Sequence, residues 1–321
     1  MLNHKTLLIT GGSGSFGRNF IAHILSTFPQ VKEIRIFSRD ELKHYEMQHY
    51  FDWGKHPSLR YILGDIRDFN LLADAMEGVD YVIHAAALKH VQMGENNPMA
   101  FIQTNIIGSE NVIRCARQHK VKRVVALSTD KAAAAVSLYG ATKLCADKLF
   151  THQHNNNTIF SVVRYGNVMG TSGSVIPHFK HYTKKGFIPL THPDMTRFNV
   201  TPQQSIDFIL YALVYAQGGE IFVPKLSSFK VIDLASAIAP DVPTQIIGLR
   251  AGEKLHEEMI TITDAPYTIE NDHYYVIVPF YKDLTHYITH YKAKSVASDF
   301  YYSSDKNDSW LDLEDLRALL F

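Results

Sequence analysis

Three glycines with a regular spacing follow the first apolar segment of the chain, and they constrain its fold more than any other feature. Residues 6–10 are apolar enough for a buried strand, and Gly11, Gly14 and Gly17 come directly after them. In a strand-to-helix turn such glycines allow a tight turn, close approach to a pyrophosphate and packing of helix on strand. The N-terminal N–H groups of the next helix then face the phosphates. This turn, with Ser13, Ser15 and Phe16, predicts a dinucleotide site; a turn without a ligand is the alternative.

Short apolar segments alternate with helical patterns through the first 165 residues. Strands are expected at Thr6–Thr10, Glu33–Phe37, Arg60–Leu63, Tyr81–His84, Arg123–Leu127 and Phe160–Arg164. Helices are expected at Phe16–Thr27, Asn70–Met76, Pro98–Gln118 and Leu138–His154. Strands that are apolar at nearly every position suit a parallel sheet covered on both faces. The alternation therefore predicts an α/β fold with a Rossmann-like, doubly wound parallel sheet.

The pattern becomes less regular after residue 166. Gly, Pro, Thr and His are common up to Pro202, helices are expected at Gln203–Ala216 and Val231–Ala239, and Asp312 is placed to cap a short docking helix near the C-terminus. We expect a cofactor-binding domain over residues 1–166, with returning segments at about 200–224. A smaller, irregular C-terminal substrate-binding lobe is expected over about 167–199 and 225–321.

Composition excludes several classes of protein. The chain of 321 residues has 32 Lys and Arg against 32 Asp and Glu, so it lacks the basic field of a non-specific nucleic-acid binder. Its 2 cysteines provide no disulfide framework, which favours a reducing compartment. No leader and no apolar run of about 20 residues is evident. We expect a cytoplasmic protein without nucleic-acid or membrane partners, and the scattered histidines show no metal-ligand spacing.

The end of the second strand indicates which dinucleotide is bound. A carboxylate at this place would bind the ribose hydroxyl of NAD, but Ser38 and Arg39 stand here, followed by Lys43. A hydroxyl and two cations suit the 2′-phosphate of NADP, whereas solvated surface charges are the alternative. Asp65 follows the third strand, where it can meet the adenine, and small residues from Ala85 follow the fourth.

A second group of residues predicts hydride transfer at a carbon that bears a hydroxyl. Thr129 follows the fifth strand, and Tyr139 and Lys143 lie one turn apart on the expected helix. A nearby ammonium favours the phenolate and so lowers the pKa of the tyrosine. A Tyr-x-x-x-Lys pair alone is weak evidence for this chemistry, but here it accompanies a glycine turn that is typical of dinucleotide sites.

At these positions the chain resembles the extended short-chain dehydrogenases/reductases. It is most similar to the inverting UDP-N-acetylglucosamine 4,6-dehydratases that open pseudaminic acid biosynthesis. The matching segments are 11–17, 38–43, 64–65, 84–90 (HAAALKH), 127–133 (LSTDKAA), 138–150 (LYGATKLCADKLF), 161–167 (SVVRYGN), 195–198 (MTRF), 219–224 (GEIFVP), 248–257 (GLRAGEKLHE) and 301–311. Thr129-Asp130-Lys131 is the most specific of them, because retaining sugar dehydratases carry Thr-Asp-Glu there.

The resemblance implies NADP, a UDP-sugar substrate, a homo-oligomer and a set of site residues. The implied catalytic residues are Thr129, Asp130, Lys131, Tyr139 and Lys143. The implied cofactor residues include, besides the turn, Ser38, Arg39, Asp40, Glu41, Leu42, Lys43, Asp65, Ile66, Ala85, Lys89, Leu127, Ser128, Val168, Met169, Gly170, Thr171 and Ser172. The implied substrate residues are Lys89, Asn167, Val175, Thr191, Arg250 and Glu253, for which surface or domain-bridging contacts are the alternative.

Lys131 has a role in the implied reaction that elementary chemistry supports. A ketone at C4 acidifies the C5 hydrogen, which a neutral lysine can abstract while a protonated Asp130 assists loss of the C6 hydroxyl. This requires the pKa of Lys131 to move toward neutrality. The alternative is that Lys131 simply pairs with Asp130 or a phosphate.

The sequence departs from the family pattern at three places. Ala134 and Ala135 replace Asn-Pro, Ser172 replaces an arginine, and Asn199 stands where an aromatic residue is common. These changes predict a looser catalytic loop and an altered sugar pocket. A retaining dehydratase, a 4-epimerase acting on another UDP-sugar and a non-catalytic NADP-binding scaffold stay open as alternatives.

Overall fold

Seven parallel strands form most of one large sheet, from β10 to the edge strand β3. They are β1 (Thr6–Thr10), β2 (Glu33–Ser38), β3 (Leu59–Leu63), β4 (Tyr81–His84), β5 (Arg123–Leu127), β6 (Ile159–Val163) and β10 (Ile221–Pro224). Their order is β10-β6-β5-β4-β1-β2-β3, so the direction of winding reverses between β1 and β4. Ligands of doubly wound sheets bind at this reversal. The computed structural model, which describes residues 1–52, 54–153, 157–170 and 175–320, thus confirms the predicted fold class.

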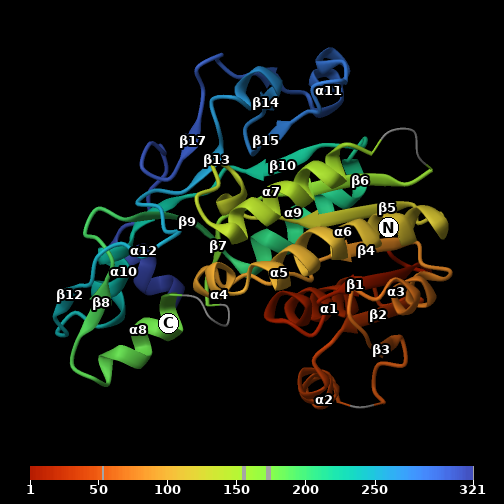
Figure 1. Ribbon diagram of the computed structural model, residues 1–321, viewed down its shortest axis with the longest axis horizontal. Helices are drawn as coiled ribbons and strands as arrows, with labels where there is room; N and C mark the ends of the chain where they lie inside the picture. The colour runs from red at the N-terminus through yellow and green to blue at the C-terminus, as the bar shows by residue number, and fades with distance from the viewer. Residues whose placement is uncertain (53, 154–156, 171–174, 321) are drawn as a thin grey trace.

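Two groups of helices cover the sheet (Figure 1). One group contains α1 (Ser15–Thr27), which packs on α9 (Pro202–Tyr215); the other contains α3 (Phe69–Met76), α6 (Gly108–Gln118) and α7 (Leu138–Thr151). α2 (Glu41–Tyr50) follows β2, and α4 (Val91–Asn96) packs on α7. No helix among the described residues combines the length and the apolar character needed to cross a bilayer.

The helix predicted over Pro98–Gln118 is confirmed in its bounds, but its middle part has a π-helical period. It is divided into α5 (Pro98–Phe101), a π-helical stretch η1 (Ile102–Ile107) and α6. Such π segments often mark functional sites. Here η1 contains Asn105, whose side chain is 1 % exposed and donates to the Thr142 hydroxyl of α7 at 3.0 Å. A buried polar contact between two helices therefore accompanies the change in helical period, which hydrophobic periodicity cannot reveal.

The C-terminal part contributes both to the main sheet and to a separate apolar cluster. β14 (Thr268–Glu270), β15 (Tyr274–Ile277) and β16 (Lys294–Ser295) extend the sheet antiparallel beyond β10, and α11 (Leu284–Tyr291) lies between β15 and β16 in the chain. The separate cluster unites α8 (Val175–Thr183), α10 (Val231–Ile238), α12 (Leu313–Leu320) and β8 (Ile188–Leu190). Figure 1 shows these elements, with β12 (Thr244–Ile246), at one end of the molecule. The division into two domains stays a prediction, and part of the expected lobe pairs with the main sheet.

Short strands connect the cluster to the sheet. β9 (Thr196–Val200) pairs with β7 (Asn167–Val168) and β11 (Ser228–Lys230), and β13 (Glu258–Ile260) pairs with β17 (Tyr302–Ser303). Residues 265–267 form a short 3-10 turn, η3 (Ala265–Tyr267). The Asp312 carboxylate accepts from the backbone N–H groups of Glu314 and Asp315 at 2.8 and 2.9 Å, which confirms the predicted cap of the C-terminal helix.

Candidate active site

The glycine turn lies at the point where the sheet reverses direction. Gly11 has φ of +69°, and a Cβ there would lie 2.8 Å from the backbone of Ala86; a Cβ on Gly17 would lie 2.1 Å from the Gly12 carbonyl. The first turn of α1 carries no acidic residue, so nothing there repels an anion. The backbone of Ala85 and Ala86 passes beside Gly11. The turn therefore fits a dinucleotide pyrophosphate, with Ser13 buried and Ser15 and Phe16 beginning the helix.

The predicted 2′-phosphate site gathers hydroxyls and cations. The Ser38 hydroxyl donates to Ser13 Oγ at 2.7 Å and contacts His44 Nε2 at 2.6 Å. Arg39 lies 3.6 Å from the Asp65 carboxylate, and Lys43 lies 3.2 Å from Asp40. Both cations have about half of their side chains exposed, at 51 % and 54 %, so they can turn toward a ligand.

The remaining cofactor candidates at this edge are distributed around these cations. Asp65 is held mainly by Arg67 at 2.7 Å, and Asp40 accepts from the Lys43 N–H to cap α2. Glu41 and Leu42 begin α2 and are exposed, whereas Ile66 is buried. Partial desolvation lowers the pKa of Lys89, and the positive charge of Lys43 lowers it further. The mutual repulsion of these two ammonium groups marks a place where an anion is favoured.

The segment that carries Lys89 is fixed against helix α7. The Asn105 side chain accepts from the Leu88 N–H at 2.8 Å and donates to the Leu88 carbonyl at 2.9 Å. Because the same amide also binds Thr142, it holds the segment after β4 at a fixed position relative to helix α7. Asn105 was missed by sequence reasoning, since an asparagine in a helical pattern gives no sign of its partners.

The predicted catalytic residues come together at the end of β5. Thr129 caps the short 3-10 turn η2 (Asp130–Ala132), and α7 follows with Ser137 as its cap, accepting from the Gly140 N–H at 3.1 Å. A Cβ on Gly140 would lie 2.2 Å from the Lys131 carbonyl. Glycine at this position therefore lets the first turn of α7, with Tyr139, lie directly on η2.

Burial dominates the acid–base chemistry of the tyrosine and lysine of α7. It raises the pKa of Tyr139 to about 12, although the Lys131 charge and a hydrogen bond with Thr129 lower it. Burial lowers the pKa of Lys143, whose ammonium donates to the Leu127 carbonyl at 2.7 Å. The expectation of a lowered tyrosine pKa is therefore wrong for this arrangement.

Lys131 lies between two carboxylates. Its ammonium is 3.0 Å from Asp130 Oδ1 and 2.9 Å from Glu257 Oε1. Burial alone would lower the pKa of Lys131, but these negative charges outweigh it and raise the pKa. Burial also raises the pKa of Asp130, with a further contribution from Glu257. The expectation of a lysine pKa near neutrality is wrong here, and the alternative pairing with Asp130 is found.

Two predicted substrate residues, Asn167 and Val175, and three predicted cofactor residues line one cavity between β7, β9 and α8. The lining residues are Asn167, Val168, Met169, Gly170, Val175, Ile176, Asn199 and Phe229. Asn167 faces Asn199 across paired strands, and Asn199 Oδ1 is buried without a hydrogen-bond partner among the described residues. The departure at Asn199 thus adds a polar group to this cavity. Thr171 and Ser172 lie outside the described residues.

The other substrate candidates follow a second pair of strands. β8 and β12 are parallel, Thr191 follows the first, and Arg250 lies four residues beyond the second. The Arg250 guanidinium binds the Glu253 carboxylate, with Nε at 2.9 Å from Oε1. Arg250 is half exposed, as a group that receives a diphosphate would be.

Three charged residues near Lys131 were missed from the sequence. Glu257 contacts Lys131, Arg197 Nε lies 3.7 Å from Glu257 Oε1, and Lys254 donates to the Ala133 carbonyl at 2.8 Å. Glu257 lies in a charged stretch that resembles a solvated loop, and only long-range packing buries it. Ser128 donates to the buried Asp147 at 2.8 Å, which Arg164 also binds at 3.1 Å.

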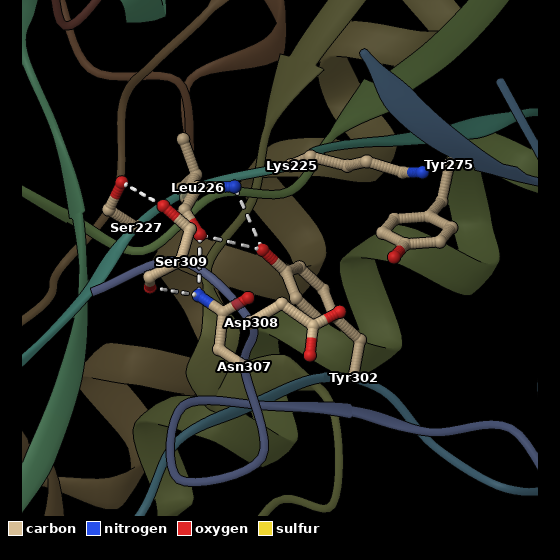
Figure 2. A pocket seen from close by; sticks show the side chains of 8 residues that line it. All are labelled: Lys225, Leu226, Ser227, Tyr275, Tyr302, Asn307, Asp308 and Ser309. Carbon is tan, nitrogen blue, oxygen red and sulfur yellow. Dashed lines mark hydrogen bonds between the residues drawn. The ribbon is translucent and has the colours of Figure 1, made fainter. Parts of the chain in front are cut away.

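A different cavity lies under the C-terminal tail and contains none of the predicted site residues (Figure 2). Its polar groups bind one another: the Tyr302 hydroxyl contacts Leu226, Asn307 donates to Ser228 Oγ at 3.0 Å, and Lys225 lies 2.8 Å from Glu270. The contacts of Tyr302 and Asn307 tie the tail to Leu226 and to the start of β11, which is a structural role.

The loop between η2 and α7 carries backbone strain at Ala134, whose φ is +44°. Alanine in this left-handed region is unfavourable, whereas asparagine tolerates it better. We expect Ala134→Asn to raise the free energy of unfolding by about 0.5–1 kcal/mol. Urea unfolding of the parent protein and the variant tests this, with Ala135→Asn as the matched control. An equal gain from both variants, or none from Ala134→Asn, would contradict the assignment of strain.

Comparison with known proteins agrees with this architecture. Residues 7–279 match the family model described as polysaccharide biosynthesis protein. A protein of Campylobacter jejuni named UDP-N-acetylglucosamine 4,6-dehydratase (inverting) is 46% identical, over 100% of this chain and 98% of its own length. A protein of Rickettsia bellii named UDP-glucose 4-epimerase is 39% identical, over 100% of this chain and 96% of its own length.

Solved structures show the same fold. Pen from Bacillus thuringiensis has a TM-score of 0.90 and 35% identity, with 100% of this chain and 98% of that chain covered. DesIV, a dTDP-glucose 4,6-dehydratase from Streptomyces venezuelae with NAD bound, has a TM-score of 0.69 and 25% identity, with 78% of this chain and 86% of that chain covered.

Proposed function

Because this chain belongs to the polysaccharide biosynthesis family of extended short-chain dehydrogenases/reductases, we propose that it is an inverting UDP-N-acetylglucosamine 4,6-dehydratase. The product is then UDP-2-acetamido-2,6-dideoxy-β-L-arabino-hex-4-ulose, the first intermediate of pseudaminic acid biosynthesis. The observation that carries the proposal is Lys131 beside Asp130, 3.0 Å apart, on the turn that supports Tyr139. A base and an acid at one place suit elimination of water next to a ketone.

The residues divide the reaction between them. Tyr139 takes the proton of the C4 hydroxyl, with Thr129 and Lys143 beside it. Lys131 removes the C5 proton, Asp130 protonates the departing C6 hydroxyl, and a new proton reaches C5 on the opposite face. When bound, the nicotinamide accepts hydride from C4 and returns it to C6.

The reaction requires a neutral Lys131 amine and a protonated Asp130. A single proton transfer converts their ion pair into this state. Movement of a proton from the ammonium to the carboxylate leaves a neutral amine and a neutral acid. Burial of Asp130, which raises its pKa, favours this transfer because it penalises the charged form. The two groups therefore acquire their roles together.

We infer that the cofactor is NADP. Ser38, Arg39 and Lys43 support this choice, since a guanidinium and an ammonium bind phosphate well. Replacing Arg39 by alanine is expected to weaken NADP binding by about tenfold or more and to leave NAD binding unchanged. Titration of the parent protein, Arg39→Ala and the control Arg60→Ala, which removes an exposed arginine beside Glu33, with both dinucleotides tests this. Equal affinity of the parent protein for NAD and NADP would overturn the choice.

A 4-epimerase is the second candidate, because of the similarity to the Rickettsia bellii protein. An epimerase returns the hydride to C4 and needs neither a base at C5 nor an acid at C6, so the Lys131–Asp130 pair favours the dehydratase. Incubation with UDP-N-acetylglucosamine and with UDP-glucose separates the two: the dehydratase yields a 4-keto-6-deoxy sugar, the epimerase a C4 epimer. Cytoplasmic location and a homo-oligomer stay predictions.

A further inference from the structure

We propose that Glu257 is a positioning residue that holds the Lys131 ammonium beside Asp130 and keeps it protonated between turnovers. The proposal rests on the proposed function, because it assigns Lys131 to the removal of the C5 proton. Glu257 lies 126 positions along the chain from Lys131, directly before β13. Only the folded chain brings the two residues together.

The geometry around Lys131 shows a built contact. Glu257 is 1 % exposed, and its Oε1 lies 2.9 Å from the Lys131 ammonium. The ammonium thus has a carboxylate on each side, at 3.0 and 2.9 Å, while about a quarter of the lysine side chain stays exposed. A lysine in this position is held at one end by protein and keeps an open side for substrate.

The backbone of Glu257 is fixed from the opposite side. Its N–H donates to Ser304 Oγ at 2.9 Å, and its carbonyl accepts from the Ser304 N–H at 2.8 Å. Ser304 Oγ also contacts Thr196 Oγ1 of β9 at 2.7 Å. The segments of Ser304 and Thr196 thus fix the place from which the carboxylate reaches Lys131.

Charges of both signs face this ammonium. The groups from the surrounding elements are Asp130, Glu257, Arg197, Lys254 and Tyr139. Lys254 lies 3.7 Å from Glu257 Oε2, an oxygen that has no hydrogen-bond partner among the described residues. Arg197 and Lys254 disfavour a charged Lys131, whereas Asp130 and Glu257 favour it. Without Glu257 only Asp130 would oppose the two cations, and Lys131 would lose its proton at lower pH.

Replacement of Glu257 by glutamine tests this account. The readout is exchange of the C5 hydrogen in deuterated buffer, measured against pH with UDP-N-acetylglucosamine. We expect the rising limb of the profile to move by about one pH unit or more to lower pH, because an opposite charge at this distance is removed. We also expect kcat to fall roughly tenfold or more through loss of positioning, with little change in KM. Glu258→Gln, next along the chain, is the control and should keep the parent profile.

A second variant and a second readout cover the case in which Glu257→Gln does not fold. Glu257→Asp keeps the negative charge but places it one methylene farther from the Lys131 ammonium. The rising limb of the pH profile should therefore move to lower pH by a smaller amount, and kcat should fall. Titration of the Lys131 ammonium by NMR of ¹⁵N-lysine-labelled protein, assigned with Lys131→Ala, reports the same change without turnover.

The outcomes separate this inference from the proposed function. Absence of C5 exchange in the parent enzyme would refute the dehydratase assignment, while the ammonium titration would still report on Glu257. Exchange in the parent, with a folded Glu257 variant that keeps the parent pH profile, kcat and ammonium titration, would refute only the role of Glu257. If Glu257 had only a structural role, its replacement would reduce the fraction of folded protein but leave the pH profile of the folded enzyme unchanged.

Discussion

Replacing Lys131 by alanine is expected to abolish exchange of the C5 hydrogen while oxidation at C4 continues. The variant lacks the base but retains Tyr139, Thr129 and Lys143, so the first half of the reaction should still reduce the bound nicotinamide once per site. Loss of a positioned base costs about 10²–10⁴ in rate. The measurement is NMR of the sugar in deuterated buffer, combined with absorbance of the reduced nicotinamide.

A control variant and a folding test show whether the loss of exchange is due to the missing base. Lys122→Ala removes an exposed lysine that pairs with Asp80 at 2.7 Å, and it should retain exchange at the parent rate. Thermal unfolding must show that Lys131→Ala is folded, because its loss leaves two buried carboxylates without their shared cation. A folded Lys131→Ala enzyme that exchanges C5 at the parent rate would show that another group is the base.

Replacing Tyr139 by phenylalanine is expected to stop the reaction before any exchange occurs. Without the phenol no group accepts the C4 proton, so neither reduced nicotinamide nor C5 deuterium should form, and the rate should fall by about 10²–10⁴. Comparison with Lys131→Ala orders the two steps: one variant is blocked before the ketone and the other after it. NMR of the sugar in deuterated buffer and absorbance of the reduced nicotinamide measure both effects.

Tyr165→Phe provides the matched control for this variant. Tyr165 is also buried, at 8 %, and its carbonyl accepts from the Asp130 N–H at 3.1 Å, but no step uses its hydroxyl. We expect this variant to retain most of the parent activity. Stoichiometric reduction of nicotinamide by Tyr139→Phe would exclude Tyr139 as the base at C4.

The fold could be predicted to the extent that local patterns determine it. Buried parallel strands are apolar at nearly every position, so β1, β4 and β5 were predicted with their observed bounds. The helix over Pro98–Gln118 was predicted with its outer bounds, but its change from α to π period, which accompanies the contact of Asn105 with Thr142, was not. The extension of the sheet by β14–β16 depends on pairing between remote segments, which no local pattern contains.

The site could be predicted where chemistry follows a short spacing. Thr129, Tyr139 and Lys143 are close in sequence, and the end of β5 and the start of α7 bring them together in the structure. Arg197 and Glu257 could not be predicted, because their charges in a polar stretch suggest exposure and their burial results from packing. The expected direction of the Lys131 pKa was wrong because the charges of the neighbouring Asp130 and of Glu257, 126 positions away, together outweigh burial.

The most direct test of the central claim is the structure of the product formed from UDP-N-acetylglucosamine in deuterated buffer. We predict a 4-keto-6-deoxy sugar with inverted configuration at C5 and one deuterium at that carbon, resolved by proton and carbon NMR. C4 of the ketone carries no hydrogen, so no H4–H5 coupling reports on C5. The configuration at C5 is therefore assigned from the ring conformation and from the through-space contacts of the methyl group attached to C5. A C4 epimer that retains its original C5 hydrogen, or a 4-keto-6-deoxy sugar with unchanged configuration at C5, would contradict the account.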